Sequence, residues 1–147
     1  MSKLQLLWLH LTVALTAITG IVFAVMKYLL QSDDEFSVVN HPLQPWMLAA
    51  HVVAAPAVLF LLGWVFSNHM LPKWRFGDGR NQRTGLAAMW LIAPMALSGY
   101  LLQVSVNETL REAMAWAHGI TSAVFVIAYL IHLVIGRLID RPSAAAE

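Results

Sequence analysis

The sequence contains no cysteine. This absence excludes disulfides, thiolate metal sites, iron–sulfur ligation, covalent haem attachment through a Cys-x-x-Cys-His motif and cysteine nucleophiles. Charge is also scarce, because only 12% of the residues are Asp, Glu, Lys or Arg, whereas 59% are hydrophobic and the net charge is +1. So much apolar content with so little charge is typical of a membrane protein. Any metal centre would have to be held by imidazoles, and we expect no nucleic-acid partner.

Four segments are apolar over a length that can cross a bilayer, which takes roughly 20 residues. They are residues 4–30, 46–67, 85–106 and 114–135. The links between them are too short to form folded extramembrane domains. The first segment is longer than the hydrophobic core of a signal peptide and no convincing cleavage site follows it, so we expect it to remain as a helix. The predicted fold is a single all-α domain over residues 1–147, an up-and-down four-helix bundle within the membrane.

Basic residues are distributed unevenly over the links and the chain ends. Seven share one side of the predicted bundle: Lys3, Lys73, Arg75, Arg80, Arg83, Arg137 and Arg141. Only Lys27 and Arg111 lie toward the other side, which is mostly acidic. Because short cytoplasmic loops are enriched in Lys and Arg, both termini are expected to be cytoplasmic. The acidic outer rim suits a basic partner such as a cytochrome c, although charged loops are more commonly just solvated.

Two histidines interrupt the last apolar segment, His118 and His132. They are 14 residues apart, close to four helical turns, so both imidazoles leave roughly the same face about 20 Å apart. Ionisable residues inside an apolar span are costly and usually functional, and His is the commonest metal ligand. Two such residues at two depths suggest two stacked cofactors. The alternative is a pair of structural imidazoles bonded to neighbouring backbone.

The topology assigns a depth to each of the other histidines. His51 falls near the outer boundary, level with His118, and His10 falls near the inner boundary, level with His132. A haem that stands between two helices needs two axial imidazoles at equal depth. The expected ligands are therefore His51 and His118 for an outer haem, and His10 and His132 for an inner haem. Their second ring nitrogens should bond to a backbone carbonyl or a hydroxyl.

Two histidines remain outside this scheme. His69 follows His51 by 18 residues and shares its face, but it lies deeper, level with the headgroups. It is the second choice for the inner haem, and otherwise an interfacial residue or a proton carrier near a quinone. His41 lies in the outer link and is expected to be solvated.

Small residues near the expected ligands leave room for a macrocycle, although they also let membrane helices pack closely. Gly20 and Gly63 each fall near the depth of the haem that their own helix does not ligate. The third segment has no histidine. Pro94, Ser98 and Gly99 are expected to bend it and let it pack as a wall around the cofactors.

Four histidines in this four-helix topology resemble those of the bacterial cytochrome b561 and nickel–iron hydrogenase cytochrome b group, which is similar to the membrane gamma subunit of formate dehydrogenase. In that family, helices one, two and four supply four axial histidines, the last two 14 residues apart. His10, His51, His118 and His132 occupy those positions. The resemblance covers essentially the whole chain. It implies two non-covalently bound b-type haems in a multi-pass protein of the bacterial inner membrane.

The resemblance also implies a function, the relay of electrons between a periplasmic redox partner and the quinone pool, with quinone near the inner haem. The short loops favour a subunit of a hetero-oligomeric redox complex over an independent enzyme. Its partners would be membrane lipid, quinone and a periplasmic cytochrome c or iron–sulfur subunit.

Two other functions stay open. Some members of the family act alone as superoxide:quinone oxidoreductases, which would need a basic outer funnel, whereas the outer links here are mostly acidic. A non-redox membrane anchor or small transporter would use the histidines structurally or to carry protons.

Overall fold

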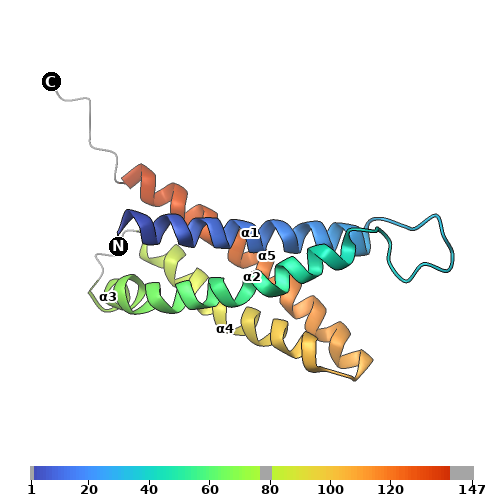
Figure 1. Ribbon diagram of the computed structural model, residues 1–147. Helices are drawn as coiled ribbons and strands as arrows, with labels where there is room; N and C mark the ends of the chain where they lie inside the picture. The colour runs from blue at the N-terminus through green and yellow to red at the C-terminus, as the bar shows by residue number, and fades with distance from the viewer. Residues whose placement is uncertain (1, 77–80, 140–147) are drawn as a thin grey trace. The chain divides into compact units, whose positions relative to one another are not determined.

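The computed structural model describes residues 2–76 and 81–139, and every regular element in these two ranges is a helix (Figure 1). In chain order the elements are α1 (Lys3–Tyr28), α2 (Gln44–Val65), the π-helix η1 (Phe66–Met70), α3 (Leu71–Phe76), α4 (Gln82–Val104) and α5 (Glu108–Ile139). Within the described residues, four continuous helical stretches are long and apolar enough to span a membrane. They are Lys3–Tyr28, Gln44–Phe76, Gln82–Val104 and Glu108–Leu138. The prediction of an all-α protein with four helices long and apolar enough to span a membrane is confirmed.

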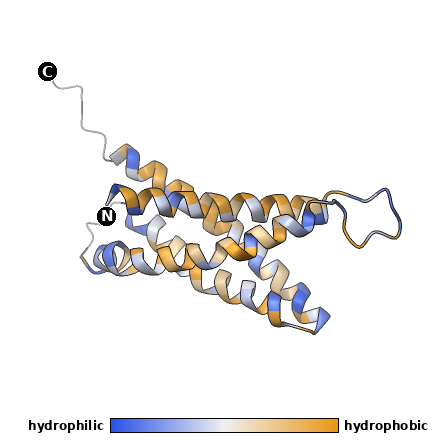
Figure 2. Ribbon diagram, in the orientation of Figure 1, coloured by the Kyte–Doolittle hydropathy of each residue, from blue (hydrophilic) through white to orange (hydrophobic). Residues whose placement is uncertain are grey.

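Hydrophobic residues make up most of these helices (Figure 2), and many of their large side chains are exposed. Phe60 on α2, for example, is 71% exposed and Leu97 on α4 is 62% exposed, whereas the buried apolar side chains are few. A soluble monomer rarely exposes contiguous apolar surface on this scale. Lipid as the surrounding solvent accounts for it, because apolar side chains then need no protein cover.

Two helix boundaries differ from the sequence prediction by more than four residues. The second span does not end at residue 67 but continues through η1 and α3 to Phe76, so that residues 68–76 of the predicted link are helical. The last helix begins at Glu108 and not at residue 114, where the Asn107 side-chain oxygen accepts a 2.9 Å hydrogen bond from the Leu110 backbone N–H. Hydropathy locates the apolar core of a span, but a helix continues into polar residues wherever its backbone hydrogen bonds and caps are satisfied.

The described chain divides into two compact units after Asn68. In the first, α1 and α2 lie side by side and antiparallel (Figure 1). A capping box starts α1, with reciprocal hydrogen bonds of 2.9 and 3.1 Å between Ser2 and Gln5. At the other end, the Asn40 side chain donates a 2.8 Å hydrogen bond to the Lys27 carbonyl, which ties the connecting loop to the end of α1.

The second unit holds α4 and α5 as an antiparallel pair, with α3 against the start of α4. The Gln82 side-chain amide donates to the carbonyls of Lys73 and Trp74, at 3.1 and 3.2 Å. Farther along α4, Pro94 lies inside the helix, and the buried Ser98 hydroxyl donates a 2.7 Å hydrogen bond to the Pro94 carbonyl. Among the basic residues used to predict the orientation, Arg80 and Arg141 lie outside the described residues.

Candidate functional site

His51 on α2 leans against the backbone of α1. Its ring nitrogen Nδ1 lies 2.9 Å from the Thr16 carbonyl oxygen. A Cβ added to Gly20 would lie only 2.8 Å from Cε1 and 2.9 Å from Nδ1 of this ring. A side chain at position 20 would therefore have to push the imidazole away from the carbonyl, whereas glycine leaves room for this contact.

His118 on α5 repeats the arrangement against α4. Its Nδ1 lies 2.9 Å from the Met95 carbonyl oxygen. A Cβ added to Gly99 would lie 3.0 Å from Cε1 and 3.1 Å from Nδ1. In both places the carbonyl belongs to the residue four positions before the glycine. That carbonyl also accepts the helical hydrogen bond of its turn. It lies 3.1 Å from the hydroxyl of the residue before the glycine, which is Thr19 or Ser98.

His132, four turns farther along α5, meets α4 at a third glycine. A Cβ added to Gly85 would lie 3.0 Å from Cε1 and 3.2 Å from Nδ1 of His132. Here the partner of Nδ1 is the hydroxyl oxygen of Thr84, at 3.1 Å. The three histidines thus share one mode of support: a glycine admits the ring to the neighbouring helix, and Nδ1 is hydrogen-bonded there.

This support fixes the chemistry of the rings. A carbonyl oxygen can only accept, so the Nδ1 of His51 and of His118 must carry the proton. A neutral imidazole protonated at Nδ1 has its basic lone pair on Nε2. Each ring is therefore held as a metal ligand is held, with one nitrogen oriented by a hydrogen bond and the other suited to coordination.

The glycines on α4 are placed in register with the histidines on α5. Gly85 and Gly99 are 14 residues apart, as are His118 and His132. In an antiparallel pair of helices with equal rise, equal spacing lets both contacts form at once. The equal spacing is visible in the sequence and predicts this pairing. Our interpretation of Gly99 as part of a bend missed it.

Unit one contains the other two predicted ligands, His10 and His51. His10 is half-buried on α1. His51 meets α1 at Gly20, ten residues after His10, which corresponds to about 15 Å along the helix axis. The two histidines of this unit therefore lie at different levels. Gly20 lies beside His51, as its depth suggested, whereas a Cβ added to Gly63 would meet nothing within 4 Å.

His69 lies beside His132. Their ring centroids are 6.4 Å apart and the ring planes are inclined by 69°. The residue belongs to η1, and π-helical turns occur frequently at functional sites. Two imidazoles on opposite sides of one metal ion have centroids roughly 6 Å apart, given a metal–nitrogen bond of about 2 Å, and an edge-to-face ring contact falls in the same range. This geometry keeps His69 as a competitor for the inner position.

His41 is held in a different way from the three histidines described above. His41, in the loop between α1 and α2, accepts a 3.1 Å hydrogen bond at Nδ1 from the Leu43 backbone N–H.

Within the described residues, no three His, Asp or Glu side chains converge as a chelating metal cluster. A haem iron held by two imidazoles needs no such cluster.

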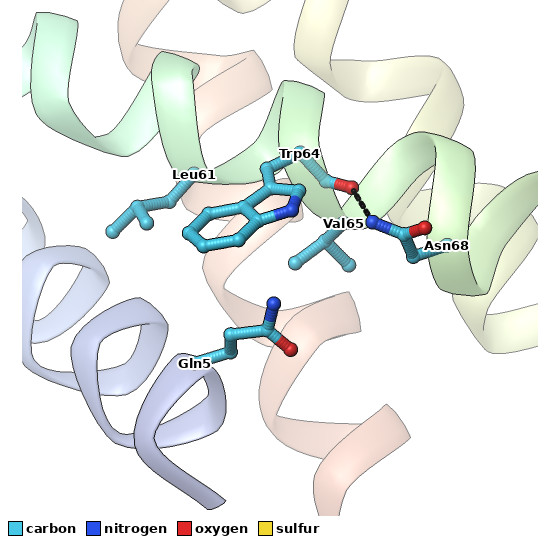
Figure 3. A pocket seen from close by; sticks show the side chains of 5 residues that line it. All are labelled: Gln5, Leu61, Trp64, Val65 and Asn68. Atoms are coloured by element: carbon cyan, nitrogen blue, oxygen red, sulfur yellow. Dashed lines mark hydrogen bonds between the residues drawn. The ribbon is translucent and has the colours of Figure 1, made fainter. Parts of the chain in front are cut away.

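Two hollows lie in unit one. The first, between α1 and α2, is lined by Gln5, Leu61, Trp64, Val65 and Asn68 (Figure 3) and has a volume of about 10 Å³. That is room for one water molecule and no more. The second is an open apolar groove on α2 of about 520 Å³, lined by Leu59, Phe60, Gly63 and Trp64. Its size and apolar lining suit a lipid chain rather than a polar substrate.

The chain matches no protein-family model, no curated protein and no solved structure. The function must therefore be inferred from the residues themselves.

The contact between Gly20 and His51 makes a prediction for stability. Gly20→Ala should lower the melting temperature, because the methyl group displaces the imidazole, and overpacking of this kind costs about 1–3 kcal/mol. Gly63→Ala is the matched control, since it adds a methyl into open space and gains up to about 1 kcal/mol of helix propensity. Thermal unfolding in detergent measures both. Equal melting temperatures for the two variants would show that the ring does not depend on the glycine.

Proposed function

We propose that this protein is a membrane cytochrome b that binds two b-type haems and relays electrons between a redox partner outside the membrane and the quinone pool inside it. The observation that carries the proposal is the shared support of His51, His118 and His132. Each imidazole lies in an apolar span, is hydrogen-bonded at Nδ1 and packs against a glycine of the neighbouring helix. A merely structural histidine needs a hydrogen bond, but it does not need one repeated device at three positions.

The ligand assignment follows from depth. His118 lies toward the outer end of α5 and is paired with His51, while His132 lies toward the inner end and is paired with His10. The two α5 histidines are about 21 Å apart along the helix axis, from a rise of about 1.5 Å per residue. Both pairings are part of the proposal.

A bound haem would supply reversible one-electron exchange at its iron. The chain's own contribution is to hold the imidazoles. Hydrogen bonds at Nδ1 fix the tautomer and the orientation of His51 and His118, so that Nε2 would be the atom that holds a haem iron. The surrounding apolar side chains exclude water, which lowers the cost of reorganisation when charge changes. Glycine beside each ring lets the ring come close enough to the neighbouring helix to make its hydrogen bond.

The spectrum of the purified protein tests the proposal directly. Two b-type haems per chain are expected in the pyridine haemochrome assay, with b-type bands in the reduced-minus-oxidised difference spectrum. A colourless protein that takes up no haem when it is expressed with ample haem supply would refute the electron-carrier function and favour an anchor or transporter. A stand-alone superoxide:quinone oxidoreductase would share the spectrum, but it would also reduce quinone with superoxide without any partner subunit.

His118→Ala should remove the outer haem and leave the inner one, so that the haem count falls from two to one. The reason is that the other α5 ligand lies four turns away and keeps its own supports at Gly85 and Thr84. His41→Ala is the control, because this loop residue lies outside the proposed ligand set. Retention of two haems by His118→Ala would mean that the outer ligand is assigned wrongly.

The inner haem offers a choice between two imidazoles. In our assignment His10→Ala loses the inner haem and His69→Ala retains it. The 6.4 Å contact between the His69 and His132 rings makes the opposite result meaningful. If His69→Ala loses the haem and His10→Ala keeps it, then His69, and not His10, would hold the inner haem together with His132.

The protein is proposed to lie in a bacterial inner membrane with both termini in the cytoplasm. The absence of native cysteine allows this to be tested with single-cysteine variants. Lys3→Cys and Arg75→Cys should be protected from an impermeant thiol reagent in intact spheroplasts and should react after lysis. Glu35→Cys and Glu112→Cys should react without lysis. The reverse pattern would overturn the orientation and, with it, the names inner and outer.

A further inference from the structure

His132 differs from the other two supported histidines in one respect. At His51 and His118 the imidazole reaches the carbonyl of the residue four positions before the glycine, Thr16 or Met95. At Gly85 the corresponding carbonyl belongs to Asn81. The imidazole does not bond it directly, because the Thr84 hydroxyl lies between them, 3.1 Å from His132 Nδ1 and 3.0 Å from the Asn81 carbonyl oxygen.

The directions of these hydrogen bonds follow from the number of protons available. A threonine hydroxyl has one proton, and the Thr84 proton goes to Asn81, whose backbone carbonyl and side-chain oxygen both lie within reach. Toward His132 the Thr84 oxygen must therefore accept. The chain of bonds runs from Nδ1–H of His132 to the Thr84 hydroxyl and on to Asn81.

Asn81 is itself held in place by α5. Its side-chain amide donates a 2.8 Å hydrogen bond to the His132 carbonyl. A Cβ added to Gly136 would lie 3.3 Å from that amide nitrogen, so the glycine gives the amide its room. Asn81 also has a φ of 54°, in the left-handed region that asparagine tolerates better than most residues. The three side chains thus close a ring that begins and ends at His132.

We propose that Thr84, backed by Asn81, is a positioning residue that tunes the coordinating nitrogen of His132 and so makes the inner haem electronically distinct from the outer one. The proposal rests on the proposed function. The acceptor bonded to Nδ1 governs how basic Nε2 is, and a more basic ligand stabilises the oxidised iron. At the outer haem this acceptor is a backbone carbonyl, which mutation cannot remove. At the inner haem it is a hydroxyl whose strength depends on the bond that it donates to Asn81.

Thr84→Val tests the inference, because valine keeps the shape of threonine and removes the hydroxyl. The inner haem should become easier to reduce, by up to about tenfold, which is about 59 mV for a one-electron couple. The outer haem should not change. Redox titration of the two haem bands in the full-length protein measures both, and the haem that remains in His118→Ala identifies the inner band. Thr84→Ser keeps the hydroxyl and should titrate as the wild type does.

Asn81→Gly provides a second, milder variant. Glycine adopts the left-handed backbone without strain, and the Thr84 hydroxyl keeps the backbone carbonyl as acceptor. The shift should have the same sign as that of Thr84→Val and be smaller. If Thr84→Val fails to retain the inner haem, retention by Thr84→Ser together with the shift in Asn81→Gly supports the inference.

Other results overturn it. An unchanged potential in Thr84→Val, an equal shift of both haems, or a Thr84→Ser variant that behaves like Thr84→Val would each rule out the hydroxyl as the tuning group. These outcomes all require a wild type with two haems, so they leave the proposed function standing. A wild type without haem would instead overturn both proposals.

Discussion

The constraint on which this structure depends is the pairing of an imidazole N–H inside an apolar span. Water is absent there, so an unpaired ring nitrogen costs free energy. The backbone N–H groups of an adjacent helix are already hydrogen-bonded within that helix. Such a helix can still offer a lone pair of a carbonyl oxygen, as at His51 and His118, or of a side-chain hydroxyl, as at His132. A neighbouring ring reaches that lone pair only where no Cβ stands in the way. A histidine that bonds to a neighbouring helix in this way therefore needs a glycine on that helix.

The same requirement explains why the helices can pack loosely and still be specific. Few apolar side chains are buried, and the outer surfaces suit lipid in almost any rotation. Polar contacts between helices are few but directional, such as the bond from Asn81 to the His132 carbonyl. In hydrocarbon these contacts select the rotation and the register of each pair, because alternative arrangements leave a donor without an acceptor.

Much of this fold was predictable from the sequence, and the errors have a common cause. Hydropathy located four spans correctly but ended the second at residue 67 and began the last at residue 114, whereas helix continues to Phe76 and starts at Glu108. The end of an apolar run marks where a helix leaves lipid and not where it stops. The stopping point depends on local caps such as Asn107.

The candidate site was predictable to a lesser degree. Histidines in apolar spans are easy to find in a sequence. The expectation that their second nitrogens bond to carbonyls or hydroxyls is met at His51, His118 and His132. The pairing of histidines between the two units stays a prediction. The roles of Gly85 and Thr84 were not foreseen, because they depend on the register of two helices, which becomes visible only when the spacing of glycines on one is compared with that of histidines on the other.

The matched spacings on α4 and α5 have a mechanical consequence. Two histidine–glycine contacts hold the register of the helices more firmly than one contact would. A shift by a single residue would break both contacts at once. The pair of helices therefore holds the two imidazoles at a fixed spacing along the helix axis. If the protein is the proposed cytochrome, helices that cannot slip would hold the distance between the two α5 ligands constant, and with it a rate of electron transfer that falls steeply with distance.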